Sequence, residues 1–215
     1  MLNRMRETMT EPRIRVAVLV SGGGTNLQAI LDAAQSEAIH SAEVVLVVSS
    51  QPGAYALERA KRASVPTAVL QKRELGGQAG FEAALEALLR EYRVDLIVLA
   101  GFLSILSDGF TKQYDHRILN VHPSLIPSFC GKGFYGRKVH EAALSRGVKV
   151  TGATVHFVNE IPDGGEIIAQ KAVEILPDDT PETLQRRVME QAEWKLLPAA
   201  VESVSAQLLA SRKDS

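Results

Sequence analysis

The first half of the chain alternates short apolar runs with amphipathic segments, and this alternation limits the fold more than any other feature. The runs Ile14–Val20 and Glu43–Ser50 are rich in Val, Ile and Leu, which predicts buried strands. The helical spacing of apolar residues is clearest at Phe81–Tyr92. Strands that are buried on both faces read as nearly continuous apolar runs, so this order predicts a parallel sheet covered by helices on both sides.

In the second half of the chain, the regular alternation of strands and helices ends. Two longer strands, Val150–Val158 and Ile167–Ile175, are joined by the turn-like sequence NEIPDGG, and they are predicted to pair antiparallel. The last helix is predicted to run from Pro181, with Thr180 as its cap, to about Leu209. The remaining predicted elements are strands at 67–70, 96–100 and 118–122 and helices at 26–37, 55–63, 108–114 and 139–146.

Together these elements predict an α/β fold: a Rossmann-like, mostly parallel twisted sheet with helices on both faces and partly antiparallel C-terminal strands. The predicted organisation is a flexible N-terminal tail at residues 1–13, a single domain at 14–209 and a frayed C-terminus at 210–215. A chain of 215 residues with 46% hydrophobic residues is long enough to form one domain with a substantial core.

The composition argues against some classes of function and indicates a cellular compartment. The formal net charge is −1, so no excess of basic residues indicates nucleic-acid binding. The single cysteine excludes an intrachain disulfide and favours a reducing, cytoplasmic setting, and no Cys/His motif suggests a metal site. A signal peptide and a membrane span are not expected, because no apolar run approaches roughly 18 residues.

A glycine-rich turn, Ser21–Asn26, follows the first predicted strand and opens the first helix. Glycines let backbone amides face a ligand, and a helix N-terminus favours an anion, so a phosphate is the expected guest. The motif is not the dinucleotide fingerprint, because Leu27 occupies the third glycine position, and no Lys follows as in a P-loop. The alternative is a plain turn with Thr25 or Asn26 as helix cap.

A second candidate site lies at the end of the strand that contains the sequence NVHPSLIPS. Asn120 and His122 are two residues apart, so in a strand their side chains share a face. An amide and an imidazole together suit the stabilisation of an oxyanion. The alternative is an Asn that satisfies a loop and a His with a purely structural hydrogen bond.

Asp163 and Cys130 are the two remaining candidates. A carboxylate at Asp163 would orient His122 or relay a proton, but the Asp–Gly sequence is also common in turns, and spacing alone favours the turn. Cys130 would need a positioned base to act as a nucleophile, and we interpret it as passive.

Five segments in a fixed order resemble the phosphoribosylglycinamide formyltransferase family of purine synthesis. They are SGGGTNLQAI, LAGFLSILS, NVHPSLIPSF, TGATVHFVNEIPDGGEIIAQ and QAEWKLLP. The resemblance covers about residues 14 to 198. It implies attack by the amine of glycinamide ribonucleotide on the formyl carbon of 10-formyltetrahydrofolate, which acts as co-substrate, with no metal. Small molecules would be the partners, without nucleic acid or membrane, and a homodimer is one expected assembly.

The resemblance also implies roles for individual residues. Asn120, His122 and Asp163 correspond to the catalytic trio, with Asp163 favouring a protonated His122. Gly24, Thr25 and Asn26 would bind the ribonucleotide phosphate, and Glu193 would hold the same substrate. A cis peptide bond is expected at Ile126-Pro127. The implied folate-binding residues are Leu103, Ser104, Ile105, Leu106, Asn120, Asn159, Glu160, Ile161, Pro162 and Asp163.

Two departures from the family pattern bear on the folate site. Ser104 stands where many relatives carry a basic residue, and CGKGFYG replaces a shorter PGLH-like segment. Two related activities remain as alternatives. Formyltetrahydrofolate deformylase typically carries His at the position of Pro123 and has an N-terminal regulatory domain, for which 13 residues leave no room. Methionyl-tRNA formyltransferase carries a C-terminal nucleic-acid-binding domain, which this chain is not expected to have. A non-catalytic nucleotide- or folate-binding protein is the alternative from a different class.

Overall fold

The described part of the protein, residues 12–213 of a computed structural model, contains one seven-stranded sheet. Residues 1–11 of the predicted N-terminal tail lie outside the described range. The strands are β1 (Ile14–Val20), β2 (Ala42–Ser49), β3 (Thr67–Val69), β4 (Leu96–Leu99), β5 (Ile118–His122), β6 (Val150–Phe157) and β7 (Ile167–Glu174).

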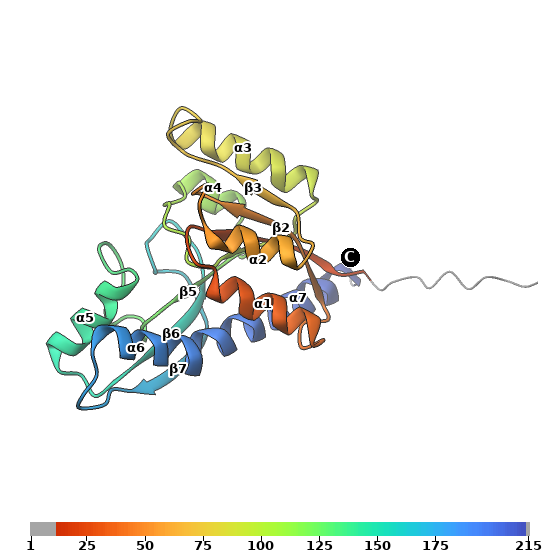
Figure 1. Cartoon of the computed structure of the whole chain (residues 1–215). Helices are drawn as coiled ribbons and strands as arrows, with labels where there is room; N and C mark the ends of the chain where they lie inside the picture. The colour runs from red at the N-terminus through yellow and green to blue at the C-terminus, as the bar shows by residue number, and fades with distance from the viewer. Residues whose placement is uncertain (1–11, 214–215) are drawn as a thin grey trace, which may run out of the picture.

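The order of the strands is β3-β2-β1-β4-β5-β6-β7. In Figure 1, β2 and β3 lie toward one edge of the sheet and β6 and β7 toward the other. The pairs from β3 to β5 are parallel, whereas β6 pairs antiparallel with both β5 and β7. The predicted fold class is therefore confirmed, including the antiparallel C-terminal strands. The chain builds outward from β1 in one direction and from β4 in the other, so the topological switch point lies between these two strands.

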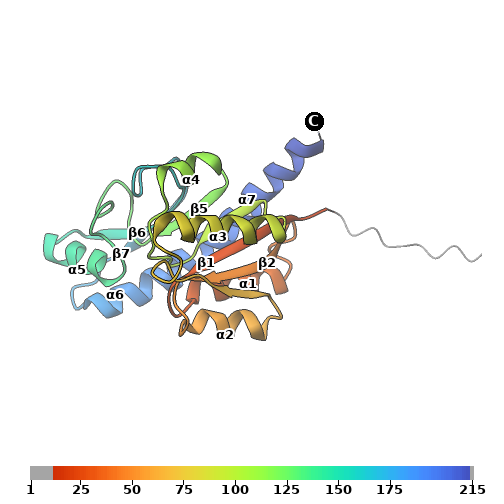
Figure 2. The ribbon, with the colours of Figure 1, turned by 90° about the horizontal axis from the view of Figure 1, so that it is seen from above.

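Helices cover both faces of the sheet (Figure 2). One core packs α1, α2 and α7 against the sheet around Val18, Ile30 and Leu197. The other packs α3 and α4 against the opposite face around Leu19, Phe81 and Phe110. The helices are α1 (Thr25–Gln35), α2 (Tyr55–Arg62), α3 (Gln78–Glu91), α4 (Asp108–Gln113), α5 (Arg137–Arg146), α6 (Pro181–Val188) and α7 (Trp194–Lys213).

The last helical stretch differs from the prediction of one continuous helix. Thr180 caps α6 and Pro181 follows it, as predicted. A π-helical turn, Met189–Glu193, then separates α6 from α7. Helix α7 continues to Lys213, beyond the predicted helix end near Leu209, while residues 214–215 lie outside the described residues. Fraying of residues 210–215 stays a prediction. Apolar spacing does not reveal a π-turn, because a single wide turn changes the periodicity by only one residue.

The single-domain assignment of residues 14–209 stays a prediction. No helix between residues 12 and 213 is long and apolar enough to span a membrane.

Candidate active site

Two loops meet at the switch point, beyond the carboxyl ends of β1 and β4. The Ser21 amide donates to the Gly101 carbonyl over 3.1 Å, and the Leu103 amide donates to the Ser21 hydroxyl over 2.9 Å. The same hydroxyl lies 2.7 Å from that of Ser50, the residue that follows β2. These contacts hold the predicted phosphate loop, Ser21–Asn26, against the predicted folate loop, Leu103–Leu106. The two loops meet at the switch point, where open α/β sheets bind ligands.

The phosphate loop leads into α1 through Gly24, which has a left-handed backbone with φ of 72°. A Cβ atom at Gly24 would lie 2.6 Å from the Cβ of Ala56, so the approach of α2 by itself requires glycine. Thr25 and Asn26 lie inside the helix, and no side chain caps its start, so the alternative in which either residue is the cap is wrong. The amides of the first turn lack helical partners, and they are available to an anion.

Asn26 joins this loop to the C-terminal helices. Its amide nitrogen donates to a carboxylate oxygen of Glu193 over 2.7 Å, and both side chains are buried. Burial raises the pKa of Glu193 to about 6, although the Asn26 hydrogen bond acts in the opposite direction. The π-turn ends at Glu193, and its first residue, Met189, lies 3.8 Å from the Thr25 hydroxyl. The π-turn thus presents two side chains to two adjacent residues of the loop.

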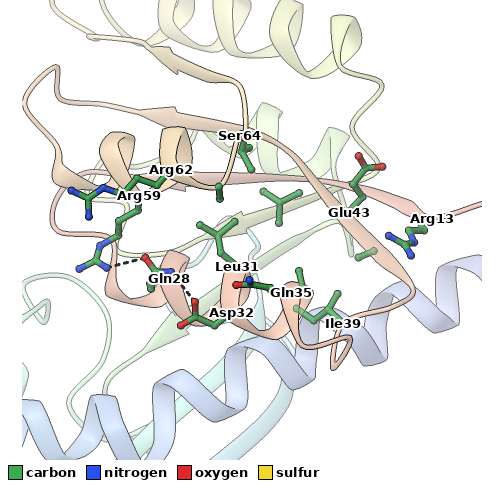
Figure 3. Close-up of a pocket in the computed structure, with 15 residues that line it drawn as sticks. Arg13, Gln28, Leu31, Asp32, Gln35, Ile39, Glu43, Arg59, Arg62 and Ser64 are labelled. Atoms are coloured by element: carbon green, nitrogen blue, oxygen red, sulfur yellow. Dashed lines mark hydrogen bonds between the residues drawn. The ribbon is translucent and has the colours of Figure 1, made fainter.

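Arg59 of α2 is a cationic side chain at the phosphate loop that the sequence did not single out. Its Nε donates to the Gly23 carbonyl over 2.8 Å, and its Nη1 donates to Gln28 over 3.0 Å. The guanidinium also lies 5.0 Å from the ring centre of Tyr55. Figure 3 shows Arg59 at one end of a cavity of about 630 Å³ between α1 and α2. That cavity contains none of the predicted catalytic residues, so we place the chemistry elsewhere.

His122 and Asp163 form the centre of the predicted catalytic group. His122, at the end of β5, is only 4% exposed. Its Nδ1 lies 3.5 Å from Oδ2 of Asp163, and its Nε2 donates to the Phe129 carbonyl over 2.9 Å. Both ring nitrogens therefore face oxygen atoms, and a doubly protonated ring satisfies both. Asp163 has a φ of 56°, so the predicted turn and the predicted carboxylate site coincide.

Asn120 contacts a histidine that sequence reasoning missed. Asn120 and His156 are directly opposite each other on β5 and β6, with Nδ2 3.1 Å from Nε2. Nδ1 of His156 donates to the Phe157 carbonyl over 2.7 Å, which leaves Nε2 facing the amide of Asn120. The same Nε2 lies 3.7 Å from Oδ1 of Asp163. The predicted trio is thus a group of four side chains.

The carboxylate of Asp163 is held in its ionised form. Burial raises the pKa of Asp163, but His156, His122 and the Gly131 amide together outweigh burial and lower the pKa below its usual value. The Gly131 amide donates to Oδ2 of Asp163 over 2.8 Å. An ionised Asp163 therefore faces the ring of His122, with Oδ2 3.5 Å from Nδ1.

A cavity of about 150 Å³ lies next to Asn120 and Asp163. Typical small-molecule pockets measure roughly 300–1,000 Å³, so this cavity suits one ring system of a larger ligand. Apolar side chains and a few polar groups line it, which fits the flat, hydrogen-bonding ring of a folate. The lining residues are Leu99, Phe102, Ser104, Ile105, Leu106, Thr111, Asn120, His156, Val158, Asn159, Glu160, Ile161, Pro162 and Asp163.

Most of the predicted folate residues line this cavity, but Leu103 does not. The side chain of Leu103 is exposed, and Ser104 is half-buried in the cavity wall. The cavity lining includes neither Lys nor Arg, so the charge that a basic residue at Ser104 would supply is not replaced there. The loop is held by Glu82, whose carboxylate accepts from both the amide and the hydroxyl of Ser107. Within residues 12–213, no group of three or more His, Cys, Asp or Glu side chains is arranged so that it could hold a metal ion.

The segment after β5 bends at a cis Ile126-Pro127 bond, so that prediction is confirmed. Cys130 follows in the same segment, half-buried, with Sγ 3.2 Å from the Pro127 carbonyl. Burial and the charge of Asp163 raise the pKa of its thiol. A neutral thiol is a poor nucleophile, which agrees with the interpretation of Cys130 as passive.

The sequence matches the family model described as Formyl transferase over residues 14–201. The chain belongs to the formyl transferase family. Phosphoribosylglycinamide formyltransferase of Haemophilus influenzae is 42% identical over 87% of this chain and 85% of its own length. The trifunctional purine biosynthetic protein adenosine-3 of Gallus gallus is 45% identical over 90% of this chain. The chain spans only about a fifth of that relative, 19% of its length.

Solved structures of the family have the same fold. Glycinamide ribonucleotide transformylase 1 of Symbiobacterium toebii superposes with a TM-score of 0.85 and 41% identity, covering 91% of this chain and 89% of its own. A formyltetrahydrofolate deformylase of Pseudomonas syringae has a TM-score of 0.81 but only 25% identity, covering 92% of this chain and 63% of its own. The formyl transferase fold therefore does not by itself separate the two activities.

Proposed function

We propose that this protein transfers the formyl group of 10-formyltetrahydrofolate to the amine of phosphoribosylglycinamide. The observation that carries the proposal is the contact of the buried His122 with Asp163, which lines a small cavity together with Asn120. The hydrogen bond between the loops that follow β1 and β4 supports the proposal, because it brings the phosphate loop beside that cavity. The identity to transformylases over most of the chain agrees with this choice of substrates.

Each side chain has a distinct role in this reaction. Attack by the amine on the formyl carbon places negative charge on the formyl oxygen, and the imidazolium of His122 and the amide of Asn120 stabilise that charge. The Asn120 nitrogen carries two hydrogens, of which His156 accepts one. For this, the N–H at Nε2 of His122 must break its hydrogen bond to the Phe129 carbonyl and donate to the oxyanion. The tetrahedral intermediate then collapses, and the bond between the formyl carbon and the folate nitrogen breaks. The amine loses a proton, the leaving folate nitrogen gains one, and Asp163 sustains the imidazolium throughout.

The ribonucleotide would lie along the phosphate loop. The uncapped amides of Gly24, Thr25 and Asn26 bind its phosphate in this proposal, and Arg59 supplies a positive charge. Glu193, fixed by Asn26, accepts hydrogen bonds from the substrate. The side chains of the phosphate loop are neutral, and the cavity beside Asn120 and Asp163 is lined by no Lys or Arg. Arg59 is therefore the cation that would balance the charge of a dianionic phosphate in this proposal.

Incubation of the purified protein with 10-formyltetrahydrofolate, with and without phosphoribosylglycinamide, tests the function. Turnover that depends on the ribonucleotide supports the proposal. Equal turnover in its absence indicates deformylase activity, and binding of both molecules without turnover indicates a non-catalytic protein. Small molecules as partners, a cytoplasmic location and a homodimer belong to the same proposal. Sedimentation at two protein concentrations tests the dimer.

A further inference from the structure

The segment Phe129–Gly131 contacts both members of the His122–Asp163 pair through its main chain. The carbonyl of Phe129 accepts from Nε2 of His122 over 2.9 Å. Two residues later, the amide of Gly131 donates to Oδ2 of Asp163 over 2.8 Å. That Oδ2 is also the carboxylate oxygen 3.5 Å from Nδ1 of His122.

We propose that the main chain of Phe129–Gly131 is a positioning element, which sets the proton arrangement of His122 and aligns it with Asp163. The inference rests on the proposed function for its kinetic consequences only. It also gives a role to the start of the CGKGFYG segment, where the sequence departs from its relatives.

The Phe129 carbonyl determines which nitrogen of His122 carries the first proton. A carbonyl only accepts, so Nε2 must be the donor, and Nδ1 is left facing Asp163. A second proton on Nδ1 then completes an ion pair. If the Phe129 carbonyl moved away, the ring would lose this preference between its nitrogens, and the pair would lose its alignment.

The Gly131 amide acts on the other partner. Its hydrogen bond stabilises the ionised carboxylate of Asp163 and is one of the contacts that lower the pKa of that group. Two backbone conformations make the double contact possible, because Phe129 and Gly131 both have positive φ angles, of 49° and 83°. The side chain of Ser124 steadies the same segment by donating to the Ser128 carbonyl.

The segment is anchored on its far side as well. Thr154 of β6 donates its hydroxyl to the Ser124 carbonyl over 2.7 Å, and it accepts from the Ile126 amide over 3.1 Å. Gln170 of β7 donates to the Ile126 carbonyl over 3.0 Å. Strands β6 and β7 thus fix the position of the segment that contacts His122 and Asp163.

Gly131→Ala and Gly133→Ala form a matched pair of variants for the kinetic test. Both glycines have left-handed φ angles, of 83° and 95°, and in neither case would an added Cβ meet an atom closer than 4.0 Å. Both alanines therefore strain the backbone alike, but only Gly131 donates to Asp163. A thermal unfolding midpoint for each variant first verifies that it is folded.

We expect Gly131→Ala to lower kcat by roughly 10-fold to 100-fold, the cost of misplacing reacting groups by about 1 Å. Both KM values should remain within about threefold of the parent. The acid limb of the kcat–pH profile should move to higher pH, because Asp163 loses a donor that favours its ionised form. Gly133→Ala should behave like the parent. Equal losses in both variants, or an unchanged profile in Gly131→Ala, would overturn the proposal.

Nitrogen NMR of the histidine rings gives a test that needs no substrate. The chain has five histidines, and His122→Asn identifies the relevant signals. At alkaline pH the neutral ring of His122 should be protonated at Nε2, and an Nδ1-protonated ring would contradict the Phe129 contact. If the tautomer is as expected but no turnover occurs with the ribonucleotide, the positioning element stands and the proposed function fails.

Discussion

The side-chain amide of Asn26 donates to the carboxylate of Glu193 over 2.7 Å, across 167 positions of sequence. Glu193 is only 6% exposed, and burial raises its pKa from 4.5 to about 6. A carboxyl whose pKa is raised in the folded state destabilises the protein once the pH exceeds that pKa. The group that we assign to substrate binding is therefore retained at a cost to stability.

Glu193→Gln should raise the free energy of unfolding at pH 7.5 by roughly 2 kcal/mol, the equivalent of a shift of about 1.5 pKa units. The gain should shrink as the pH falls through 6 and be absent near pH 4, where Glu193 is neutral in both states. Urea unfolding at several pH values measures it. The KM for the ribonucleotide should rise at the same time. A gain over the parent that is no larger at pH 7.5 than at pH 4 would contradict the prediction.

Asp163→Asn should lower kcat by roughly 10²–10⁴-fold, the usual contribution of an acid–base group, with much smaller changes in KM. The amide keeps the size of the side chain but removes the negative charge beside His122. Asp115→Asn is a matched control, because Asp115 lies 3.0 Å from His116 in an exposed pair. If Asp163→Asn stays within about threefold of the parent, Asp163 is a turn residue only.

Arg59→Gln should raise the KM for the ribonucleotide about tenfold or more, because a hydrogen bond to a charged group is lost. The KM for the folate should not change. Arg62→Gln provides the control, since Arg62 also approaches the Tyr55 ring, at 5.7 Å, but forms no hydrogen bond with the phosphate loop. Steady-state kinetics at two salt concentrations distinguish the variants, and equal effects at Arg59 and Arg62 would remove Arg59 from the phosphate site.

Cys130→Ala should retain most of kcat, because the substrate amine attacks the formyl carbon without an enzyme nucleophile. Alkylation of the parent with iodoacetamide should nevertheless abolish activity, since the adduct would displace the segment that contacts Asp163. The reaction should be slow at neutral pH, because the thiol pKa is raised. The alanine variant should resist the reagent, and inactivation of both proteins would exclude Cys130 as the site of damage.

The strands could be predicted well because their apolar runs are short and bounded by turn residues. β1 and β5 begin and end at the predicted residues, and the antiparallel pairing of β6 and β7 followed from a single turn sequence. The π-turn could not be predicted, because Met189–Glu193 keeps helical spacing on both sides. The place of Glu193 came from the family resemblance alone.

The contacts within the site were harder to predict than its members. His156 lies within the apolar strand β6, where a lone histidine carries no signal, and only the register against β5 brings it to Asn120. The contact of Gly131 with Asp163 joins two loops that are 32 residues apart, and no local pattern encodes such a pairing. The assignment of Gly24 to the phosphate was incomplete, because packing against Ala56 also requires glycine there.

The wide turn at Met189–Glu193 has a consequence for the phase of the helices on either side of it. Each residue of an α-helix advances the side-chain direction by about 100°, and a π-turn inserts one residue, so the apolar stripe of α6 and that of α7 are offset by that angle. Deleting one residue from this turn would restore a regular helix. It would also rotate α6 relative to α7, so that either Leu184 or Leu197 would have to leave its buried position. The π-turn thus sets the rotation of α6 relative to α7, and the burial of both helices constrains the number of residues in this segment.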